Sequence, residues 1–284
     1  MPELPEVETI ARDLQQEVAG SRIRAVEVTK RDVLRVVGAV ALKRRMAGVT
    51  IQRAWRRAKL VVLDLSSGDR LVASLRFTGG FRVTGAALSG AKGHGSRVTP
   101  VPYSCVQWLL HDRRVLHYIE VRRLGTVSLM TPRQFEQYEA RLGVEPLEPA
   151  FTPDHLFSLL RGSRQAVKKR IMDQRAVVGI GNIYANEALW RAGIDPSRAS
   201  RTVDRAASDR LHRDVVAVLR EALDSRGTSF RDYRDALGER GEFSLRLAAY
   251  GREGEPCLRC GARLVGTHAI DGRATVLCAR CQTS

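Results

Sequence analysis

The chain has 284 residues, and its 47 lysines and arginines against 31 aspartates and glutamates give a formal net charge of +16 at pH 7. This length accommodates two domains with a small appended module and excludes a miniprotein, while basic residues spread along the chain modestly favour a polyanionic partner such as nucleic acid. No apolar run approaches the roughly 18 residues of a membrane span, and the N-terminus lacks a signal-peptide pattern, so we expect a cytoplasmic protein without membrane association.

The first twenty residues predict an amphipathic helix. Its apolar side chains recur at intervals of three and four residues: Leu4, Val7, Ala11, Leu14 and Val18. Gly20 suits the C-terminal cap of such a helix. Glu3, Glu6 and Glu8 lie at its start, where carboxylates complement the helix dipole, so a well-capped surface helix is one interpretation of this stretch.

Pro2 indicates a second use for the same stretch. Methionine before a small residue is commonly removed, and loss of Met1 leaves the secondary amine of Pro2 as the terminal group. An α-amino group titrates near about 8, below lysine at roughly 10.4, so part of it is nucleophilic at neutral pH. Glu3 can then shuttle protons, and Glu6 shares its helix face. An acylated Pro2 nitrogen is not nucleophilic, so the hypothesis requires removal of Met1.

Residues 1–131 are predicted to form a β-sandwich or flattened barrel that carries this helix. Alternating apolar and polar residues mark its antiparallel strands: 23–28, 49–55, 60–65, 71–75, 105–110, 115–119 and 126–130. Cys105 is expected to be a buried strand residue. Residues 85–100 are rich in Gly and Ser and are expected to form a mobile loop.

Residues 132–249 have the periodicity of helices. The predicted helices are 133–142, 154–160, 164–172, 182–192 and 203–225. The glycines of Gly179-Ile180-Gly181-Asn182 permit tight turns and bring backbone N–H groups to a helix N-terminus, which is a site where phosphate binds. Glycines in a helical hairpin are also ordinary turn residues, so spacing alone leaves both interpretations open.

Residues 250–284 contain four of the five cysteines, as Cys257-x-x-Cys260 and Cys278-x-x-Cys281. This pattern predicts one Zn²⁺ ion bound by four thiolates. A closed shell of four sulfurs leaves no position for catalytic water, so the zinc is expected to be structural. It would hold a hairpin whose turn presents Arg273, a residue that at such a tip is ordinarily solvated.

Three stretches, taken in order along the chain, resemble the formamidopyrimidine-DNA glycosylases (Fpg/MutM) of the Fpg/Nei family. They are the opening PELPEVET, the run GIGNIYANE from Gly179 to Glu187, and the zinc hairpin. The resemblance spans the whole chain and implies an α+β multidomain fold. Its parts would be an N-terminal catalytic β-sandwich (1–131), a helical helix-two-turns-helix DNA-binding domain (132–249) and a C-terminal zinc-finger hairpin (250–284).

The resemblance also implies an activity. The chain would be a monomeric bifunctional DNA glycosylase and apurinic-site lyase that acts on damaged double-stranded DNA and is associated with the nucleoid. It would excise oxidised purines, such as formamidopyrimidines and 8-oxoguanine, through a Schiff base on Pro2 and β,δ-elimination. In this scheme Glu3 shuttles protons and Glu6 holds the extruded base. Lys59 lies in a turn near Pro2 and assists the chemistry. From its position in the sequence alone, Lys59 would be interpreted as an ordinary exposed basic side chain.

Further family positions would contact DNA. Asn182 and Arg273 correspond to residues that contact phosphates near the lesion, and the segment from Tyr233 to Phe243 resembles the loop that covers the extruded base. Phe77, Arg122 and Leu124 match the family's void-filling set, which occupies the gap left by the flipped nucleotide. Ordinary core packing is the alternative for Phe77 and Leu124.

This chain departs from the family at the void-filling set. It has SLRF, ending at Phe77, where the family usually has HLGM, and EVRRLG from Glu120 where the family has DPRRFG. The changes put opposite-base discrimination in doubt. A noncatalytic DNA-damage-binding protein, an endonuclease VIII-like glycosylase for oxidised pyrimidines, and a zinc-ribbon transcription factor remain alternatives, although mere binding requires neither Pro2 nor Lys59.

Overall fold

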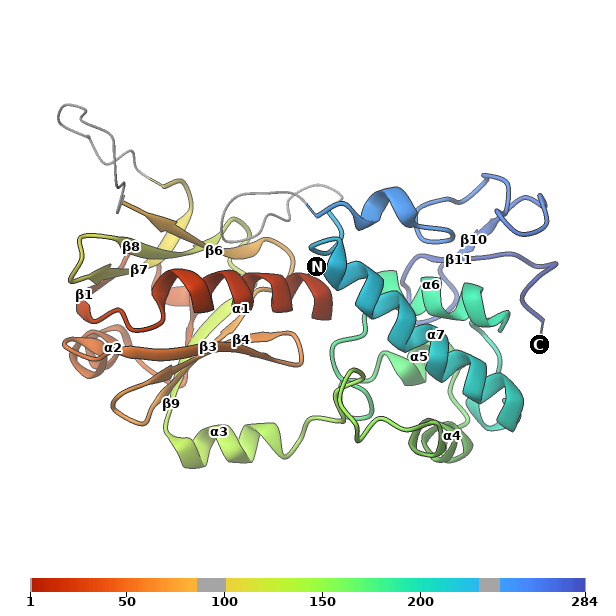
Figure 1. The fold of residues 1–284 in the computed structure, drawn as a ribbon, viewed down its shortest axis with the longest axis horizontal. Helices are drawn as coiled ribbons and strands as arrows, with labels where there is room; N and C mark the ends of the chain where they lie inside the picture. The colour runs from red at the N-terminus through yellow and green to blue at the C-terminus, as the bar shows by residue number, and fades with distance from the viewer. Residues whose placement is uncertain (1, 86–100, 230–240, 284) are drawn as a thin grey trace. The chain divides into compact units, whose positions relative to one another are not determined.

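The computed structural model describes residues 2–85, 101–229 and 241–283, and the chain divides into two compact units. Unit 1 consists mainly of Glu6–Ala140, and unit 2 of Glu3–Pro5, Arg141–Thr228 and Glu242–Ser284. Figure 1 shows the helices and strands of both units. The predicted mobile loop at 85–100 and the predicted base-covering loop at 233–243 lie almost entirely outside the described residues.

Unit 1 is a sandwich of two sheets, as predicted. Its strands are β1 (Ile23–Val28), β2 (Leu34–Arg35), β3 (Ile51–Arg57), β4 (Leu60–Leu65), β5 (Arg70–Ser74), β6 (Gly79–Thr84), β7 (Ser104–Leu110), β8 (Val115–Glu120) and β9 (Thr126–Met130). One sheet has the order β1-β7-β8-β6 and the other the order β2-β9-β5-β4-β3. All neighbours are antiparallel except β2 and β9.

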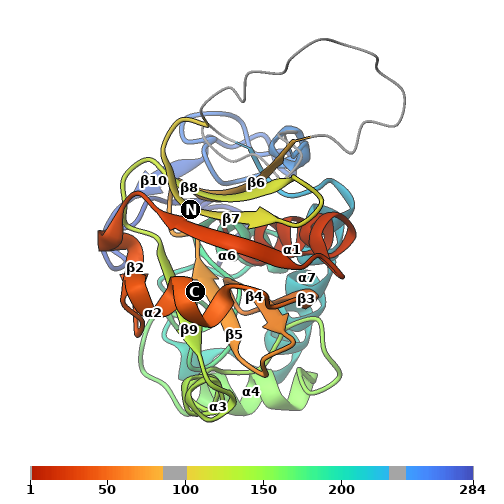
Figure 2. The same ribbon diagram turned by 90° about the vertical axis from the view of Figure 1, so that its left-hand side faces the viewer.

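Helix α1 (Leu4–Val18) closes one side of this sandwich. It lies between β7 of one sheet and β3 of the other in both views (Figure 1, Figure 2). Val7, Ile10, Leu14 and Val18 are fully buried in a core shared with both sheets, and each such side chain contributes about 1.5–3 kcal/mol. The three-and-four spacing therefore predicted both the helix and the face it buries.

The sequence missed the segments of unit 1 whose local signals are weak. Strand β6 begins with Gly79 and Gly80, which have low strand propensity, and β2 has only two residues. Helix α2 (Ala39–Met46) buries only Leu42 and Met46. The short 3₁₀ helix η1 (Arg31–Val33) precedes it. Cys105 is buried in β7, as predicted.

Unit 2 contains most of the predicted helices. They are α4 (Pro153–Arg161), α5 (Val167–Ile171), α6 (Asn182–Ala192) and α7 (Arg205–Asp224), followed by the short 3₁₀ helix η3 (Phe243–Arg246) and the hairpin β10 (Val265–Thr267) and β11 (Thr275–Leu277). Helix α3 (Pro132–Glu139), capped by Thr131, is grouped with unit 1, and the hairpin is grouped with the helices. No helix within the described ranges combines the length and apolarity needed to cross a lipid bilayer.

The ends of the segment between α7 and η3 are joined to each other. Thr228 and Glu242 form an antiparallel bridge, and the backbone N–H of Phe243 donates to the carbonyl of Gly227 at 3.0 Å. These backbone hydrogen bonds thus hold the C-terminal end of α7 beside the start of η3.

Glu187 on α6 connects the helices to the chain that leads into the hairpin. Its carboxylate is fully buried and accepts backbone hydrogen bonds from Ala248 and Ala249 at 2.9 Å and from Tyr250 at 2.8 Å. Burial raises the pKa of this carboxyl group, and the three N–H donors oppose that rise. A buried carboxylate is tolerated here because backbone donors satisfy it.

We predict that Glu187→Gln lowers the free energy of unfolding by about 2–4 kcal/mol, because the amide turns N–H donors toward backbone donors that then lose their acceptor. Urea denaturation followed by circular dichroism measures this change. Glu148→Gln, an exposed position in the same unit, is the control and should leave the midpoint unchanged. Equal midpoints for both variants would contradict the assignment.

Candidate functional site

The carboxylate of Glu3 lies at the N-terminus of α6. Its Oε2 accepts the backbone N–H of Gly181 at 2.7 Å and of Tyr184 at 3.4 Å, and its Oε1 accepts that of Ile183 at 3.0 Å. The side chain is almost completely buried. These donors are the ones a helix leaves unpaired, and the dipole favours an anion there. These backbone N–H groups therefore bind a carboxylate of the chain itself, and the predicted contact of Asn182 with a DNA phosphate stays a prediction.

The turn before α6 is shaped around Leu4. Gly179 has a φ of +81°, which suits glycine, and a Cβ there would lie 2.7 Å from the Cβ of Leu4. The backbone N–H of Leu4 donates to the carbonyl of Gly179 at 3.0 Å. Leu4 is buried among the helices of unit 2. The double-glycine turn thus binds the residue that follows Glu3.

A second group of contacts joins α5 and α6 to the hairpin turn. The amide of Asn182 donates to the carbonyl of Ala274 at 2.9 Å, and the Nζ of Lys168 donates to the same carbonyl at 3.1 Å and to Thr275 Oγ1 at 2.7 Å. Arg273 precedes this shared carbonyl, and its side chain remains 53% exposed. The hairpin therefore holds its backbone against the helices while it presents a cationic side chain to solvent.

Sequence reasoning missed Lys168. The residue is fully buried, and burial lowers its pKa to about 8, with Asp271 and Glu3 opposing the shift and Arg273 adding to it. Val167 and Ile171 on the same short helix are also buried. The position of Lys168 between the apolar residues Val167 and Ile171 could have indicated that it is buried. However, Lys168 belongs to the run Lys168-Lys169-Arg170, which resembles a solvated basic segment.

Lys59 lies in the turn between β3 and β4 of unit 1. The preceding Ala58 has a φ of 54°, as a tight hairpin turn requires. Arg56 connects this turn to α1, because its Nε is 2.9 Å from Glu8 Oε2 and its Nη1 donates to the carbonyl of Ala58 at 3.0 Å. The turn of Lys59 is therefore fixed to the helix whose first turn contains Glu6.

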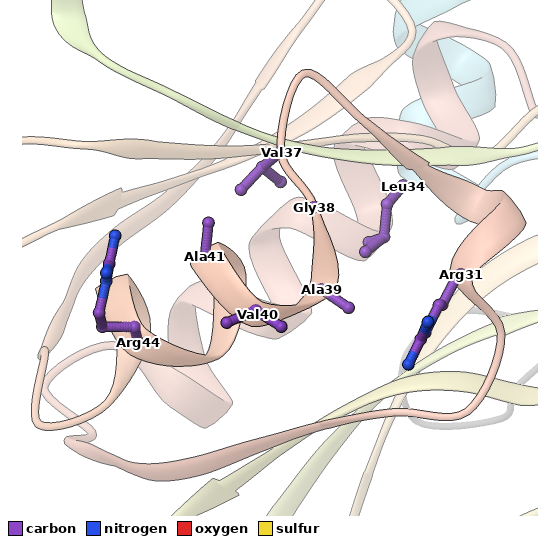
Figure 3. Close-up of a pocket in the computed structure, with 8 residues that line it drawn as sticks. All are labelled: Arg31, Leu34, Val37, Gly38, Ala39, Val40, Ala41 and Arg44. Atoms are coloured by element: carbon purple, nitrogen blue, oxygen red, sulfur yellow. The ribbon is translucent and has the colours of Figure 1, made fainter.

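A hollow of about 630 Å³ in unit 1 lies elsewhere, between η1 and α2 (Figure 3). Leu34, Val37 and Val40 line it, and Arg31 and Arg44 flank it. Among the described residues, its lining contains no carboxylate, thiol or imidazole. That lining therefore offers no group for proton transfer or nucleophilic attack, and it includes none of the residues predicted to act in catalysis.

The four hairpin cysteines converge on one point. The sulfur atoms of Cys257, Cys260, Cys278 and Cys281 all lie within 4.8 Å of one another, and those of Cys260 and Cys278 are 3.5 Å apart. Four thiolates at such separations fit a tetrahedral Zn²⁺ shell, as predicted. Trp190 of α6 packs in the same apolar cluster as two of the cysteines.

Comparison with known protein families agrees with this architecture. Residues 1–127 match the formamidopyrimidine-DNA glycosylase N-terminal domain, residues 142–234 its H2TH domain, and residues 254–283 the zinc finger found in FPG and IleRS. A formamidopyrimidine-DNA glycosylase of Xanthomonas campestris pv. campestris (strain B100) is 42% identical over 99% of this chain and 100% of its own length. The chain belongs to the formamidopyrimidine-DNA glycosylase family.

Solved structures of formamidopyrimidine-DNA glycosylases have the same fold. MutM (Fpg) of Thermus thermophilus is 35% identical, with a TM-score of 0.85 over 99% of this chain and 98% of that chain. Lactococcus lactis Fpg in complex with a DNA containing N7-benzyl-Fapy-dG is 31% identical, with a TM-score of 0.88 over the full length of both chains. As in the family's zinc finger, the four cysteines bind one structural zinc.

The residues predicted to fill the void in the duplex are exposed. Phe77 is 50% exposed and Leu124 is 52% exposed, so the alternative that they are ordinary core residues was wrong. Arg122 is exposed as well. Large apolar side chains that are exposed together in one region of a surface indicate an interaction site.

We predict a pH signature for Lys168. Its pKa in the folded state lies below its value of about 10.4 in the unfolded chain, so between these values the unfolded chain binds more protons and stability rises with pH. The free energy of unfolding of the wild type minus that of Lys168→Met should increase by about 2 kcal/mol between pH 8 and about pH 10. Urea titrations at several pH values measure it, and a constant difference would contradict the assignment.

We also predict that chelation of zinc, or Cys278→Ser, unfolds the hairpin and weakens DNA binding, because metal binding and folding are coupled in such small modules. Metal content, circular dichroism and DNA affinity measured on the same samples test this. Cys105→Ser, at the buried cysteine outside the cluster, is the control and should retain zinc. If replacing zinc with a different divalent metal changed the reaction on DNA and left the affinity for DNA unchanged, the site would not be structural.

Proposed function

We propose that this chain is a bifunctional DNA glycosylase and apurinic-site lyase that removes oxidised purines, such as formamidopyrimidines and 8-oxoguanine, from duplex DNA. Membership of the formamidopyrimidine-DNA glycosylase family supports the activity. The observation that carries the residue assignment is the Glu3 carboxylate, which α6 holds in one orientation immediately beside Pro2.

The reaction begins with a damaged nucleotide extruded from the duplex. After removal of Met1, the secondary amine of Pro2 attacks C1′ of the sugar, and the C1′–N bond to the base breaks as the base gains a proton. Opening of the sugar ring gives an iminium ion between Pro2 and the sugar. A secondary amine makes this cation permanent, so it withdraws electrons from the neighbouring carbon atoms.

Strand cleavage follows from that electron withdrawal. Loss of a proton from C2′ expels the 3′ phosphate in β-elimination, and a second proton loss expels the 5′ phosphate in δ-elimination. Water then hydrolyses the iminium and returns Pro2 as the free amine. No step requires a metal-bound water, which agrees with a zinc ion enclosed by four thiolates.

Glu3 suits the proton transfers. Its carboxylate is adjacent in the chain to the attacking amine, and three backbone N–H donors at the start of α6 hold it in one orientation. A positioned carboxylate within reach of the sugar or the base exchanges protons efficiently in the transition state. Because the backbone donors orient the group before substrate arrives, little reorganisation is needed during the reaction.

The remaining assignments concern binding. Lys59, Asn182 and Arg273 contact the DNA backbone around the extruded nucleotide, Lys59 and Arg273 assist the chemistry there, and Glu6 holds the base. Phe77, Leu124 and Arg122 fill the gap in the duplex. The exposed side chain of Arg273 and the complex of the similar Lactococcus lactis Fpg with lesion DNA support these roles. We further propose that the protein acts as a monomer in the cytoplasm, where a reducing environment keeps zinc thiolates intact.

We predict that protein lacking Met1 forms a covalent adduct with 8-oxoguanine duplex in the presence of borohydride, which reduces the iminium. Protein engineered to retain Met1 should bind the duplex without forming the adduct, because its Pro2 nitrogen is an amide. Denaturing gels measure the adduct, and mass spectrometry establishes the state of the terminus. Equal adduct with and without Met1 would remove Pro2 from the mechanism, and binding without any adduct would favour a noncatalytic damage-binding protein.

Glu3→Gln should retain lesion binding while base release in a single turnover falls by roughly 10²- to 10⁴-fold. Glu27→Gln, an exposed strand position, is the matched control. An unchanged rate for Glu3→Gln would exclude the proton shuttle. A duplex with an oxidised pyrimidine, run in parallel, distinguishes an endonuclease VIII-like preference.

A further inference from the structure

Two loops of unit 1 cross from one sheet to the other: residues 75–78 and residues 121–125. We call them the crossing loops. Strands β5 and β9 are paired where these loops begin and end, at Ser74 and Thr126, and strands β6 and β8 are paired at Gly79 and Glu120. Because both ends of one loop are hydrogen-bonded neighbours of both ends of the other, the crossing loops run side by side.

Both crossing loops expose large apolar side chains, Phe77 in the first and Val121 and Leu124 in the second. Each also contains one residue in the left-handed region, Arg76 with a φ of 49° and Arg123 with a φ of 54°. Such a conformation costs energy in a residue other than glycine, so contacts with surrounding groups must hold both loops in place.

The carboxylate of Glu120 supplies those contacts to both loops. Its Oε1 accepts the hydroxyl of Thr78, beside Phe77, and the backbone N–H of Arg122 at 3.1 Å. Its Oε2 accepts the backbone N–H of Gly125, beside Leu124, at 2.7 Å. Glu120 is 1% exposed, so water does not compete for these bonds.

The surroundings leave the second loop little freedom. A Cβ on Gly125 would lie 2.7 Å from the carbonyl of Ser74 and would clash with the Tyr118 hydroxyl and with Glu120. The Tyr118 hydroxyl donates to that same Ser74 carbonyl at 3.0 Å. Residue 121, which follows Glu120 in this loop, is a valine. Hydrogen bonds to the Glu120 carboxylate therefore fix a loop that no proline ring constrains.

We propose that Glu120 is a positioning residue that fixes Phe77 and Leu124 relative to each other and thereby sets the discrimination among bases opposite a lesion. This inference rests on the proposed function, in which the two side chains fill the gap beside the opposite base. Glu120 itself touches no reacting atom. Its effect should therefore appear when an opposite strand is present and vanish when there is none.

The test compares Glu120→Gln with the wild type on duplexes that carry 8-oxoguanine opposite each of the four bases. We measure the single-turnover rate of excision for each opposite base, and we call the ratio of the fastest rate to the slowest the spread. Glu120→Gln should narrow this spread by about tenfold, because the amide cannot accept hydrogen bonds from both loops. Cleavage of an abasic site in single-stranded DNA should stay within about twofold of the wild type, since no opposite base exists there. Thr78→Val should narrow the spread too. The double variant Glu120→Gln/Thr78→Val should narrow it little more than Glu120→Gln alone, because the two residues act through the same hydrogen bond.

Leu65→Ala is the control for lost stability, because Leu65 is buried in β4 at a distance along the strand from the crossing loops. It should destabilise the sandwich and leave the spread intact. The inference is overturned if Glu120→Gln keeps the wild-type spread, if single-strand cleavage falls in proportion, or if an active wild type shows equal rates for all four bases. A wild type that forms no borohydride adduct would overturn the proposed function together with it.

Discussion

The placement of the Glu3 carboxylate on the N-terminus of α6 is the constraint on which the candidate site depends. Three backbone N–H groups that the helix leaves unpaired meet an anion only two residues from the start of the chain. A terminus is ordinarily the least ordered part of a protein. Here the helix dipole, the buried carboxylate and the contact of Leu4 with Gly179 fix a segment that would otherwise fray. A nucleophile at the terminus can act with a defined geometry only if such an anchor exists.

Structural zinc and buried polar groups likewise fix the hairpin in place. The shared carbonyl of Ala274, with its donors Asn182 and Lys168, ties a short two-stranded element to the helices. Two strands alone are marginally stable in water, so both the metal and these bonds are required. The cost is a lysine held in a buried position, where its charged form is disfavoured.

Much of this architecture can be predicted because it follows from the regular spacing of apolar residues and cysteines along the sequence. The helix at Leu4–Val18, the strands Leu60–Leu65 and Thr126–Met130 and the four cysteines follow directly from spacing. The roles of Glu3, Lys168 and Glu120 were not predictable in this way, because each depends on groups far away in the chain. The sequence predicts that Glu3 complements the dipole of its own helix or shuttles protons, and neither prediction includes its bonds to the N-terminus of α6. No local pattern shows which helix terminus a carboxylate will reach, and a basic run does not reveal that one of its members faces inward.

The bridge between Thr228 and Glu242 has a consequence for how members of such a family diverge. Closing a loop costs free energy that grows only slowly with its length, and here both ends are already held by backbone hydrogen bonds inside the helical unit. The bonds that join the two ends are made by backbone atoms of residues 225, 227, 242 and 243, so a change of side chain at these positions does not remove a donor or an acceptor unless it introduces proline. The C-terminal end of α7 and the start of η3 can therefore stay joined in related chains that differ in sequence here.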